Sequence, residues 1–220
     1  MRYSNPNSQN IWDLWGPVLL TISLYLGIRQ YIGEARYIPS GSMLPGLKIN
    51  DRLIVEKITL RQRSPRRGEI VVFNSPYSFD RILSREIGPS PLKCGLLNFP
   101  LIVVLMGLRD PACDAYIKRV VAIGGDQVIV NLKGEVFIGG IKRKESYVTN
   151  FCNLDRDDFS NCKALKVKVP KGHVLVLGDN RRNSWDGRFW PGSPFLPEKE
   201  ILGRAVLRFW PLNRIGLLRS

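Results

Sequence analysis

Two serines in an irregular, proline-rich stretch are the residues of this chain best suited to nucleophilic chemistry. Residues 38–47 read IPSGSMLPGL and contain Ser40 and Ser42. Proline removes a backbone donor and pushes the preceding residue toward extended geometry, so this segment suits neither a helix nor a strand interior. A serine held in a rigid loop beside backbone N–H groups can attack a carbonyl and stabilise the oxyanion that forms. Taken alone, the segment is more typical of a polar surface turn.

A serine nucleophile needs a base, and histidine is scarce in this sequence. The chain has one histidine, His173, where a turn runs into a strand-like segment. That position is typical of an ordinary strand-start residue, so a Ser-His-Asp arrangement is not favoured. The base for Ser42 is therefore expected to be another residue type.

Lysine is the alternative base, provided that it is buried. Lys118 lies in the apolar segment YIKRVV, residues 116–121. Burial disfavours the ammonium form and can lower a lysine pKa from about 10.4 to about 7–8, where the neutral amine accepts a proton. Strand alternation would put Lys118 on one face with Tyr116 and Val120, opposite Arg119. A lysine on an exposed edge strand is the competing interpretation.

A third polar constellation occupies residues 178–188, which read GDNRRNSWDGR after a strand-like run. Side chains of these types bond readily to the backbone and to one another. Ser184 could bond to a neighbouring amine, and Asp186 could pair with Arg188 and fix the loop. An ordinary polar surface loop is the alternative, but the density of such residues favours an organised site.

The elements that would position these residues are strands. Runs rich in valine, isoleucine and aromatic residues alternate with glycine and proline turn signals. They cover residues 52–57, 69–74, 115–123, 127–131, 135–138, 166–169, 173–177 and 203–210. Strands without intervening helical periodicity predict a mainly β fold, an antiparallel β-sheet domain with a β-rich cap or insertion.

An apolar segment precedes this domain. Residues 14–32 read LWGPVLLTISLYLGIRQYI, and the first charge in them is Arg29. Nineteen residues can span a bilayer, so one N-terminal transmembrane helix is predicted, with residues 1–13 as a cytoplasmic tail and 37–220 as the folded domain. A cleaved signal peptide is the rival, but residues 34–36 are not a small-X-small cleavage site.

Composition limits the partners. The 220 residues carry a formal net charge of +14, which suits anionic lipid head groups. Aromatic residues do not alternate with basic ones as in proteins that bind single strands, so nucleic acid is not expected. Residues 75–115 interrupt the strand rhythm, and their apolar run 96–107 is too short to cross a membrane. A buried strand or a patch that dips into the bilayer surface are the two interpretations of that run.

The four cysteines fall into two groups, Cys94 with Cys113 and Cys152 with Cys162. No C-x-x-C motif is present, so a zinc ribbon or a thioredoxin-type site is not favoured. One or two disulfides are expected if the domain lies outside the cytosol. Free buried thiols are the alternative, and the sequence does not choose between them.

Three motifs in this order, IPSGSMLP, YIKRVVAIGGD and GDNRRNSWDGR, closely resemble the bacterial type I signal peptidase (leader peptidase) family. The C-terminal ending and residues 109–116, which read RDPACDAY, resemble cyanobacterial members. The resemblance runs from residue 37 to residue 210 and includes the preceding anchor. It implies a Ser/Lys endopeptidase that removes signal peptides from secretory preproteins after small residues, typically Ala-X-Ala. It further implies a single-pass protein of the plasma or thylakoid membrane whose catalytic domain faces the periplasm or lumen, without metal or cofactor.

The resemblance also implies roles for individual residues. Ser42 matches the family nucleophile, Lys118 its general base, Ser40 a contributor to the oxyanion hole and Ser184 the residue that orients the lysine. The pair that stabilises the site is matched by Asp186 and Arg188. Positions that line the pocket for small side chains are matched by Ile38, Pro39, Tyr116 and Ile117.

Two other functions compete with this one. A repressor-type autoprotease uses the same chemistry on itself, but it predicts a DNA-binding domain and commonly an Ala-Gly cleavage site, and the chain has no Ala-Gly dipeptide. A catalytically weak or inactive paralogue would act as a membrane-tethered basic binding module. That function gives no reason for Ser42 and Lys118 to be coupled.

Overall fold

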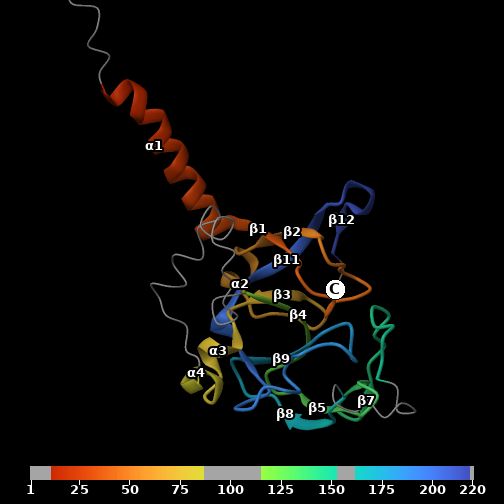
Figure 1. Cartoon of the computed structure of the whole chain (residues 1–220). Coiled ribbons are helices and arrows are strands. Elements are labelled where there is room, and N and C mark those ends of the chain that lie inside the picture. The colour runs from red at the N-terminus through yellow and green to blue at the C-terminus, as the bar shows by residue number, and fades with distance from the viewer. Residues whose placement is uncertain (1–10, 87–114, 153–161, 219–220) are drawn as a thin grey trace, which may run out of the picture.

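The protein is mainly antiparallel β, with two sheets and a helix that projects from one end (Figure 1). The computed structural model describes residues 11–86, 115–152 and 162–218. Figure 1 shows the smaller sheet at the end of the molecule opposite α1. The predicted mainly β, antiparallel architecture is confirmed.

The larger sheet has the strand order β1-β2-β11-β3-β4-β9-β10, and β12 pairs with β11. Its strands are β1 (Gly33–Tyr37), β2 (Arg52–Glu56), β3 (Ile70–Phe73), β4 (Tyr116–Ile123), β9 (His173–Leu177), β10 (Leu196–Pro197), β11 (Ile201–Trp210) and β12 (Gly216–Leu217). The smaller sheet has the order β7-β6-β5-β8. Its strands are β5 (Gln127–Val130), β6 (Val136–Ile138), β7 (Ile141–Lys142) and β8 (Leu165–Lys168).

Helices are few and short apart from the first. They are α1 (Ile11–Gly27), the π-helical η1 (Ile28–Ile32), α2 (Thr59–Gln62), α3 (Pro76–Phe79), α4 (Leu83–Glu86) and the 3-10 turns η3 (Glu198–Glu200) and η4 (Leu212–Arg214). The apolar run 96–107, with Cys94 and Cys113, lies outside the described residues.

Every strand-like run of the sequence is a strand. The strands that pattern analysis missed are β1, β7, β10 and β12, which are short or, like GEARY in β1, lack alternating apolar residues. Pairing with a neighbour, rather than local propensity, makes these segments extended.

The two faces of the central strands β3 and β4 pack into different cores. Val72 pairs with Ile117, and both belong to the core that includes Met43. Phe73 pairs with Tyr116 and contributes to the core with Trp190 on the other face. Directly paired residues of neighbouring strands share a face, so the predicted alternation along β4 is confirmed.

Alternation gives Lys118 an interior position. Lys118 pairs with Val71 on the face of Phe73, and β4 lies between β3 and β9. Lys118 is therefore on a central strand, and the edge-strand interpretation is wrong. The neighbouring strands thus enclose an ionisable side chain, and this enclosure affects its basicity.

The N-terminal helix α1 presents exposed apolar side chains, among them Leu19, Leu20 and Leu24. It continues into η1, which leads directly into β1. Within the described part of the chain, none of the helices has both the length and the apolar character that crossing a bilayer requires.

Candidate active site

The segment 38–47 is a loop fixed by its apolar residues. Ile38, Met43 and Leu47 are buried in one core cluster, and the amide of Ile38 donates to the carbonyl of Asp51 at 2.9 Å. Within the loop, Leu47 N–H donates to the Met43 carbonyl at 2.9 Å. The serines lie between these anchors, so core packing holds the loop that carries them.

The loop brings Ser42 to Lys118, which lies 76 residues further along the chain. Lys118 Nζ donates to Ser42 Oγ at 2.8 Å and to the Ile117 carbonyl at 3.1 Å. Ser40 Oγ lies 3.4 Å from Ser42 Oγ. The two residues that the sequence singled out for nucleophile and base are therefore in direct contact.

Burial changes the basicity of Lys118. Its side chain is only 4% exposed. Desolvation lowers the pKa of Lys118 to about 8, against the charges of Asp186 and Asp179, which raise it. With that pKa about a tenth of the amine is neutral at pH 7, and this fraction, which increases with pH, can accept the proton of a serine hydroxyl.

Ser184 lies where residues 178–188 meet the nucleophile loop. A Cβ built on Gly178 would lie 2.2 Å from Ser184 Oγ and 2.5 Å from the Ser42 carbonyl oxygen. Glycine is required at residue 178 because a side chain there would collide with both serines. Ser184 Oγ is buried, and its interaction with the Asp186 carboxylate helps to lower the pKa of that group. The predicted bond from Ser184 to Lys118 is not formed here, although both side chains lie near Ser42.

Asp186 and Arg188 form a fully buried ion pair, which the sequence indicated. Arg188 Nε and Nη2 each donate to Asp186 at 2.9 Å, and the amide of Gly178 donates to Asp186 Oδ2 at 3.0 Å. Burial raises the pKa of Asp186, but the Arg188 charge and these hydrogen bonds outweigh it, so the pKa is below its ordinary value. The carboxylate is therefore ionised and fixes the loop at Gly178.

Sequence reasoning missed Asn180, which bonds directly to the loop 38–47. The Asn180 amide donates to the Ser42 carbonyl at 3.0 Å, and Asn180 Nδ2 donates to the Gly41 carbonyl at 3.1 Å. The signal was present, since asparagine in a turn after a strand often bonds to backbone groups. Its partners were not foreseeable, because they lie more than 130 residues away.

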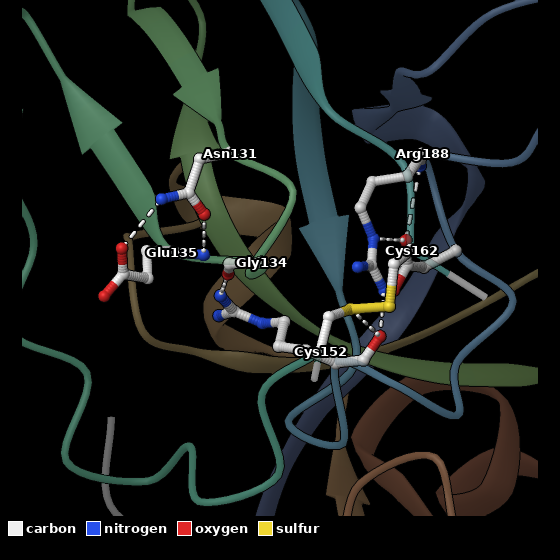
Figure 2. Close-up of a disulfide and its surroundings, with 8 residues drawn as sticks. Asn131, Gly134, Glu135, Cys152, Cys162 and Arg188 are labelled. Atoms are coloured by element: carbon white, nitrogen blue, oxygen red, sulfur yellow. Dashed lines mark hydrogen bonds and ion pairs between the residues drawn. A yellow bond between two sulfur atoms is a disulfide. The ribbon is translucent and has the colours of Figure 1, made fainter. Parts of the chain in front are cut away.

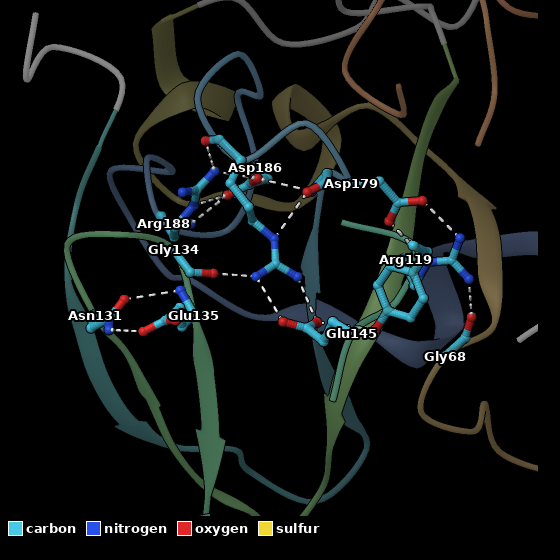
Figure 3. Close-up of polar contacts among 12 residues, drawn as sticks. Gly68, Arg119, Asn131, Gly134, Glu135, Glu145, Asp179, Asp186 and Arg188 are labelled. Atoms are coloured by element: carbon cyan, nitrogen blue, oxygen red, sulfur yellow. Dashed lines mark hydrogen bonds and ion pairs between the residues drawn. The ribbon is translucent and has the colours of Figure 1, made fainter. Parts of the chain in front are cut away.

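A second buried ion pair, also missed, lies on the other face of β4 (Figure 3). Arg119 donates to both carboxylate oxygens of Asp179, at 2.9 and 2.7 Å, and to the Gly68 carbonyl at 2.7 Å. Its guanidinium also lies over the ring of Tyr147, 3.9 Å from the centroid. Asp179 precedes Asn180, so this pair fixes the strand end from which the loop departs.

Comparison with known proteins shows which family this chain is similar to. Residues 11–210 match the family model described as signal peptidase, peptidase S26. The chain is 40% identical over 211 residues to the probable signal peptidase I-2 of Synechocystis sp., covering 96% of this chain and 78% of that protein. It is 41% identical over 199 residues to signal peptidase I of Leptolyngbya laminosa, covering 90% and 79%.

The chain belongs to the signal peptidase family, peptidase S26. Another family member, the chloroplastic thylakoidal processing peptidase 1 of Arabidopsis thaliana, is 31% identical over 197 residues, covering 90% of this chain and 47% of that protein. The crystal structure of a signal peptidase I from Enterococcus faecalis covers 64% of this chain and 97% of that chain, with a TM-score of 0.39 and 18% identity.

The expected pocket residues of this signal peptidase adjoin Ser40 and Lys118 along the chain. Tyr116 and Ile117 precede Lys118 on β4, and Pro39 is exposed beside Ser40. Ile38 is only 1% exposed and packs in the core, so its side chain offers little surface to a ligand. Tyr116 contacts Trp185, with ring centroids 5.9 Å apart, an aromatic neighbour that sequence reasoning did not select.

A disulfide lies beside residues of the loop 178–188 of this signal peptidase (Figure 2). It joins Cys152 to Cys162, with Cα atoms 6.0 Å apart. Cys152 Sγ lies 3.8 Å from the Arg181 carbonyl, which also accepts from Arg188 Nη2 at 2.9 Å. Of the two arrangements left open by the sequence, the disulfide therefore holds for this pair of cysteines.

Metal ligands are not gathered at the site. Among residues 11–86, 115–152 and 162–218, no cluster of three histidine, cysteine or carboxylate side chains could hold a metal ion. The groups near Ser42 are a hydroxyl, an amine and backbone amides, which are suited to acyl transfer.

Proposed function

We propose that Ser42 is the nucleophile and Lys118 the general base with which this protein removes signal peptides. Membership of the signal peptidase family makes the protein a serine endopeptidase. The observation that supports this assignment is the 2.8 Å hydrogen bond between Ser42 Oγ and the buried amine of Lys118. A weak paralogue acting as a basic binding module would not need this bond.

The chemistry follows from the two side chains. Neutral Lys118 takes the proton of Ser42, whose oxygen attacks the scissile carbonyl. The Lys118 ammonium gives that proton to the leaving amine as the C–N bond breaks, which forms the acyl-enzyme and leaves Lys118 neutral. Lys118 then removes a proton from water, which attacks the ester, and returns a proton to the Ser42 oxygen as the ester bond breaks. The Ser40 hydroxyl and the Ser42 N–H are the proposed donors to the oxyanion in both steps.

The residues around this pair have supporting roles in the proposal. Ser184 is proposed to orient the Lys118 amine, because its buried hydroxyl lies beside Gly178, next to the loop that carries Ser42. The ion pair of Asp186 and Arg188 keeps the loop in place. It acts through the backbone of Gly178, to which Asp186 is bonded at 3.0 Å.

The substrate is proposed to be a secretory preprotein cut after small residues, typically Ala-X-Ala. Ile38, Pro39, Tyr116 and Ile117 are the proposed contacts for the residues before the cut. The proposal is supported by their positions in sequence immediately before Ser40 and Lys118. Tyr116 and Ile117 border the base. Large substrate side chains next to them would therefore compete for space with the substrate backbone.

The membrane location is proposed from the N-terminal segment. The exposed apolar residues of α1, continued by η1, support a single-pass anchor over residues 14–32. The disulfide of Cys152 with Cys162 supports a domain on the periplasmic or lumenal side, where disulfides persist. Residues 1–13 would then be cytoplasmic, and the net charge of +14 suits anionic lipids at the surface of a plasma or thylakoid membrane.

Substitution of Ser42 by alanine tests the catalytic assignment. We expect Ser42→Ala to lower kcat for an Ala-X-Ala preprotein in detergent by at least about a thousandfold, because the covalent step is lost. Cleavage is measured by the release of mature protein, and thermal melting shows whether the fold is retained.

Ser64→Ala is the matched control, since Ser64 is exposed and lies on another loop. It should cleave at the rate of the unchanged protein. Full activity of a correctly folded Ser42→Ala variant would contradict the Ser/Lys mechanism. Absence of cleavage by the unchanged protein would instead favour the non-catalytic paralogue.

A further inference from the structure

The end of the N-terminal helix is bonded to the domain rather than connected to it by a free linker. The last turns of a helix carry carbonyl groups without partners inside the helix. Here the Arg29 carbonyl accepts from Lys57 Nζ at 2.9 Å, and the Gln30 carbonyl accepts from Arg61 Nη2 at 2.9 Å. The Ile32 carbonyl accepts from the amide of Lys57 at 2.9 Å.

These donors come from the segment that immediately follows β2, the strand paired with β1. We call the four residues Arg29, Glu34, Lys57 and Arg61 the helix–sheet junction. Glu34 is 7% exposed and lies 3.3 Å from Lys57 Nζ and 3.8 Å from Arg29 Nε. The Arg61 guanidinium also lies over the Tyr31 ring, 5.1 Å from its centroid.

The charges of the junction suit a helix end. Cations near the carbonyl terminus interact favourably with the helix dipole and replace water as donors. Glu34 balances them, so the partly buried amine of Lys57 keeps an ionic partner. A mobile tether would require none of these bonds, because water would satisfy the same carbonyl groups.

The chain that leaves the junction is equally constrained. Gly33 is required because a Cβ there would lie 2.7 Å from the Val55 carbonyl oxygen. From Gly33 to Tyr37 the chain is β1, paired residue by residue with β2, and Ile38 then enters the core. About 17 Å of extended strand therefore separates the helix end from the loop that carries Ser42.

We propose that the helix–sheet junction sets the position of Ser42 relative to the membrane surface, with Lys57 and Arg61 as positioning residues for the cleavage of membrane-tethered substrates. This inference rests on the proposed anchor over residues 14–32. A preprotein inserted in the membrane through its own apolar segment presents its scissile bond at a certain height above the membrane surface. That height is set by the residues between the apolar segment and the scissile bond. A fixed Ser42 meets that bond only within a narrow range of spacings.

The experiment uses the full chain in vesicles that contain anionic lipid. The substrates are preproteins whose spacer between the apolar segment and Ala-X-Ala is shortened or lengthened residue by residue, and a soluble peptide with the same cleavage sequence. The unchanged protein should show a sharp optimum of spacing. In Lys57→Ala with Arg61→Ala, we expect the optimum to broaden and its rate to fall about tenfold, since a loosened tether lowers the effective concentration of the site.

The controls separate positioning from stability. Cleavage of the soluble peptide should stay within about twofold, because Ser42 and Lys118 are untouched and only the tethered reaction depends on effective concentration. Lys57→Arg should keep the sharp optimum, since it retains a donor. Lys199→Ala with Arg66→Ala removes the same charge from two exposed positions on other segments and should change neither measurement.

Three outcomes would overturn the inference. An unchanged spacing optimum would show that the junction does not position the site, and an equal loss on both kinds of substrate would show a general structural effect. Failure of the unchanged protein to float with vesicles would refute the anchor, and with it this inference. An active Ser42→Ala variant would refute the catalytic assignment while leaving the spacing result readable.

Discussion

Lys118 and Arg119 are adjacent cations on β4, buried to the same degree, 4% and 3% exposed, but on opposite faces of the strand. Lys118 bonds to a hydroxyl and a carbonyl, whereas Arg119 makes a two-point ion pair with Asp179. Burial without a bonded carboxylate lowers the pKa of Lys118 to about 8. A planar guanidinium matches a carboxylate at two points, so Arg119 serves structure.

The comparison teaches that the partner, not burial alone, decides what a buried cation does. An amine bonded to neutral groups bears the cost of desolvation and becomes a base. A guanidinium that is matched to a carboxylate stabilises the arrangement only while both partners remain. In the proposed mechanism the same strand therefore supplies the base on one face and a support for the loop 178–188 on the other.

Removing Arg119 should destabilise the protein, whereas removing Lys118 should not. Arg119→Met leaves Asp179 buried without its partner and should lower the free energy of unfolding by about 3–5 kcal/mol. Lys118→Met removes an ammonium whose burial, with a pKa of about 8 against 10.5, costs about 3 kcal/mol, and should not destabilise the protein at pH 7. Denaturant titration in detergent measures both.

The contrast has an internal control. Arg119→Met combined with Asp179→Asn should recover part of the lost stability, because the second change removes the stranded charge. Lys118→Met should abolish cleavage while it keeps its melting temperature. Equal destabilisation by the two single changes would refute the distinction between the two faces.

The pH dependence of cleavage should follow Lys118. Because the amine must be neutral, kcat/KM should fall about tenfold for each pH unit below about 8 and level off above it. The free energy of unfolding also depends on this pKa, which is lowered in the folded state. Between about pH 8 and pH 10.5 the unfolded chain therefore binds more protons than the folded protein. The contribution of Lys118 to stability increases with pH over that window. Rates measured from pH 5 to 10 with a soluble peptide test this, and a flat profile would exclude a lysine base.

The smallest expected effect concerns the loop that faces Ser42. Asn180→Ala removes the donor to the Gly41 carbonyl and should lower kcat about tenfold with little change in KM, because Ser42 is less well positioned. Steady-state kinetics with the soluble peptide separates the two parameters. Asn183→Ala, an exposed change in the same loop, is the control and should be neutral. A rise in KM alone would assign Asn180 to substrate binding instead.

The strands and the reactive residue types were predictable because both are local properties. Alternation of apolar residues placed Lys118 opposite Arg119, and the scarcity of histidine pointed from Ser42 to a lysine. The motif 178–188 was recognisable as an organised loop, and the pairing of Asp186 with Arg188 follows from their closeness in sequence. Strand order was not accessible, since β11 inserts between β2 and β3 although it comes late in the chain.

What the sequence by itself determined was the chemical inventory: a serine in a rigid loop, a lysine in an apolar strand and a polar loop after another strand. Only the tertiary structure decided that Lys118 lies on a central strand. It also decided that Asn180 donates to the carbonyls of residues 41 and 42, and that Lys57 donates to the Arg29 carbonyl at the helix end. The physical reason is that pKa values and bond partners depend on groups distant along the chain. Burial that converts an ordinary lysine into a base exists only once those groups have packed around it.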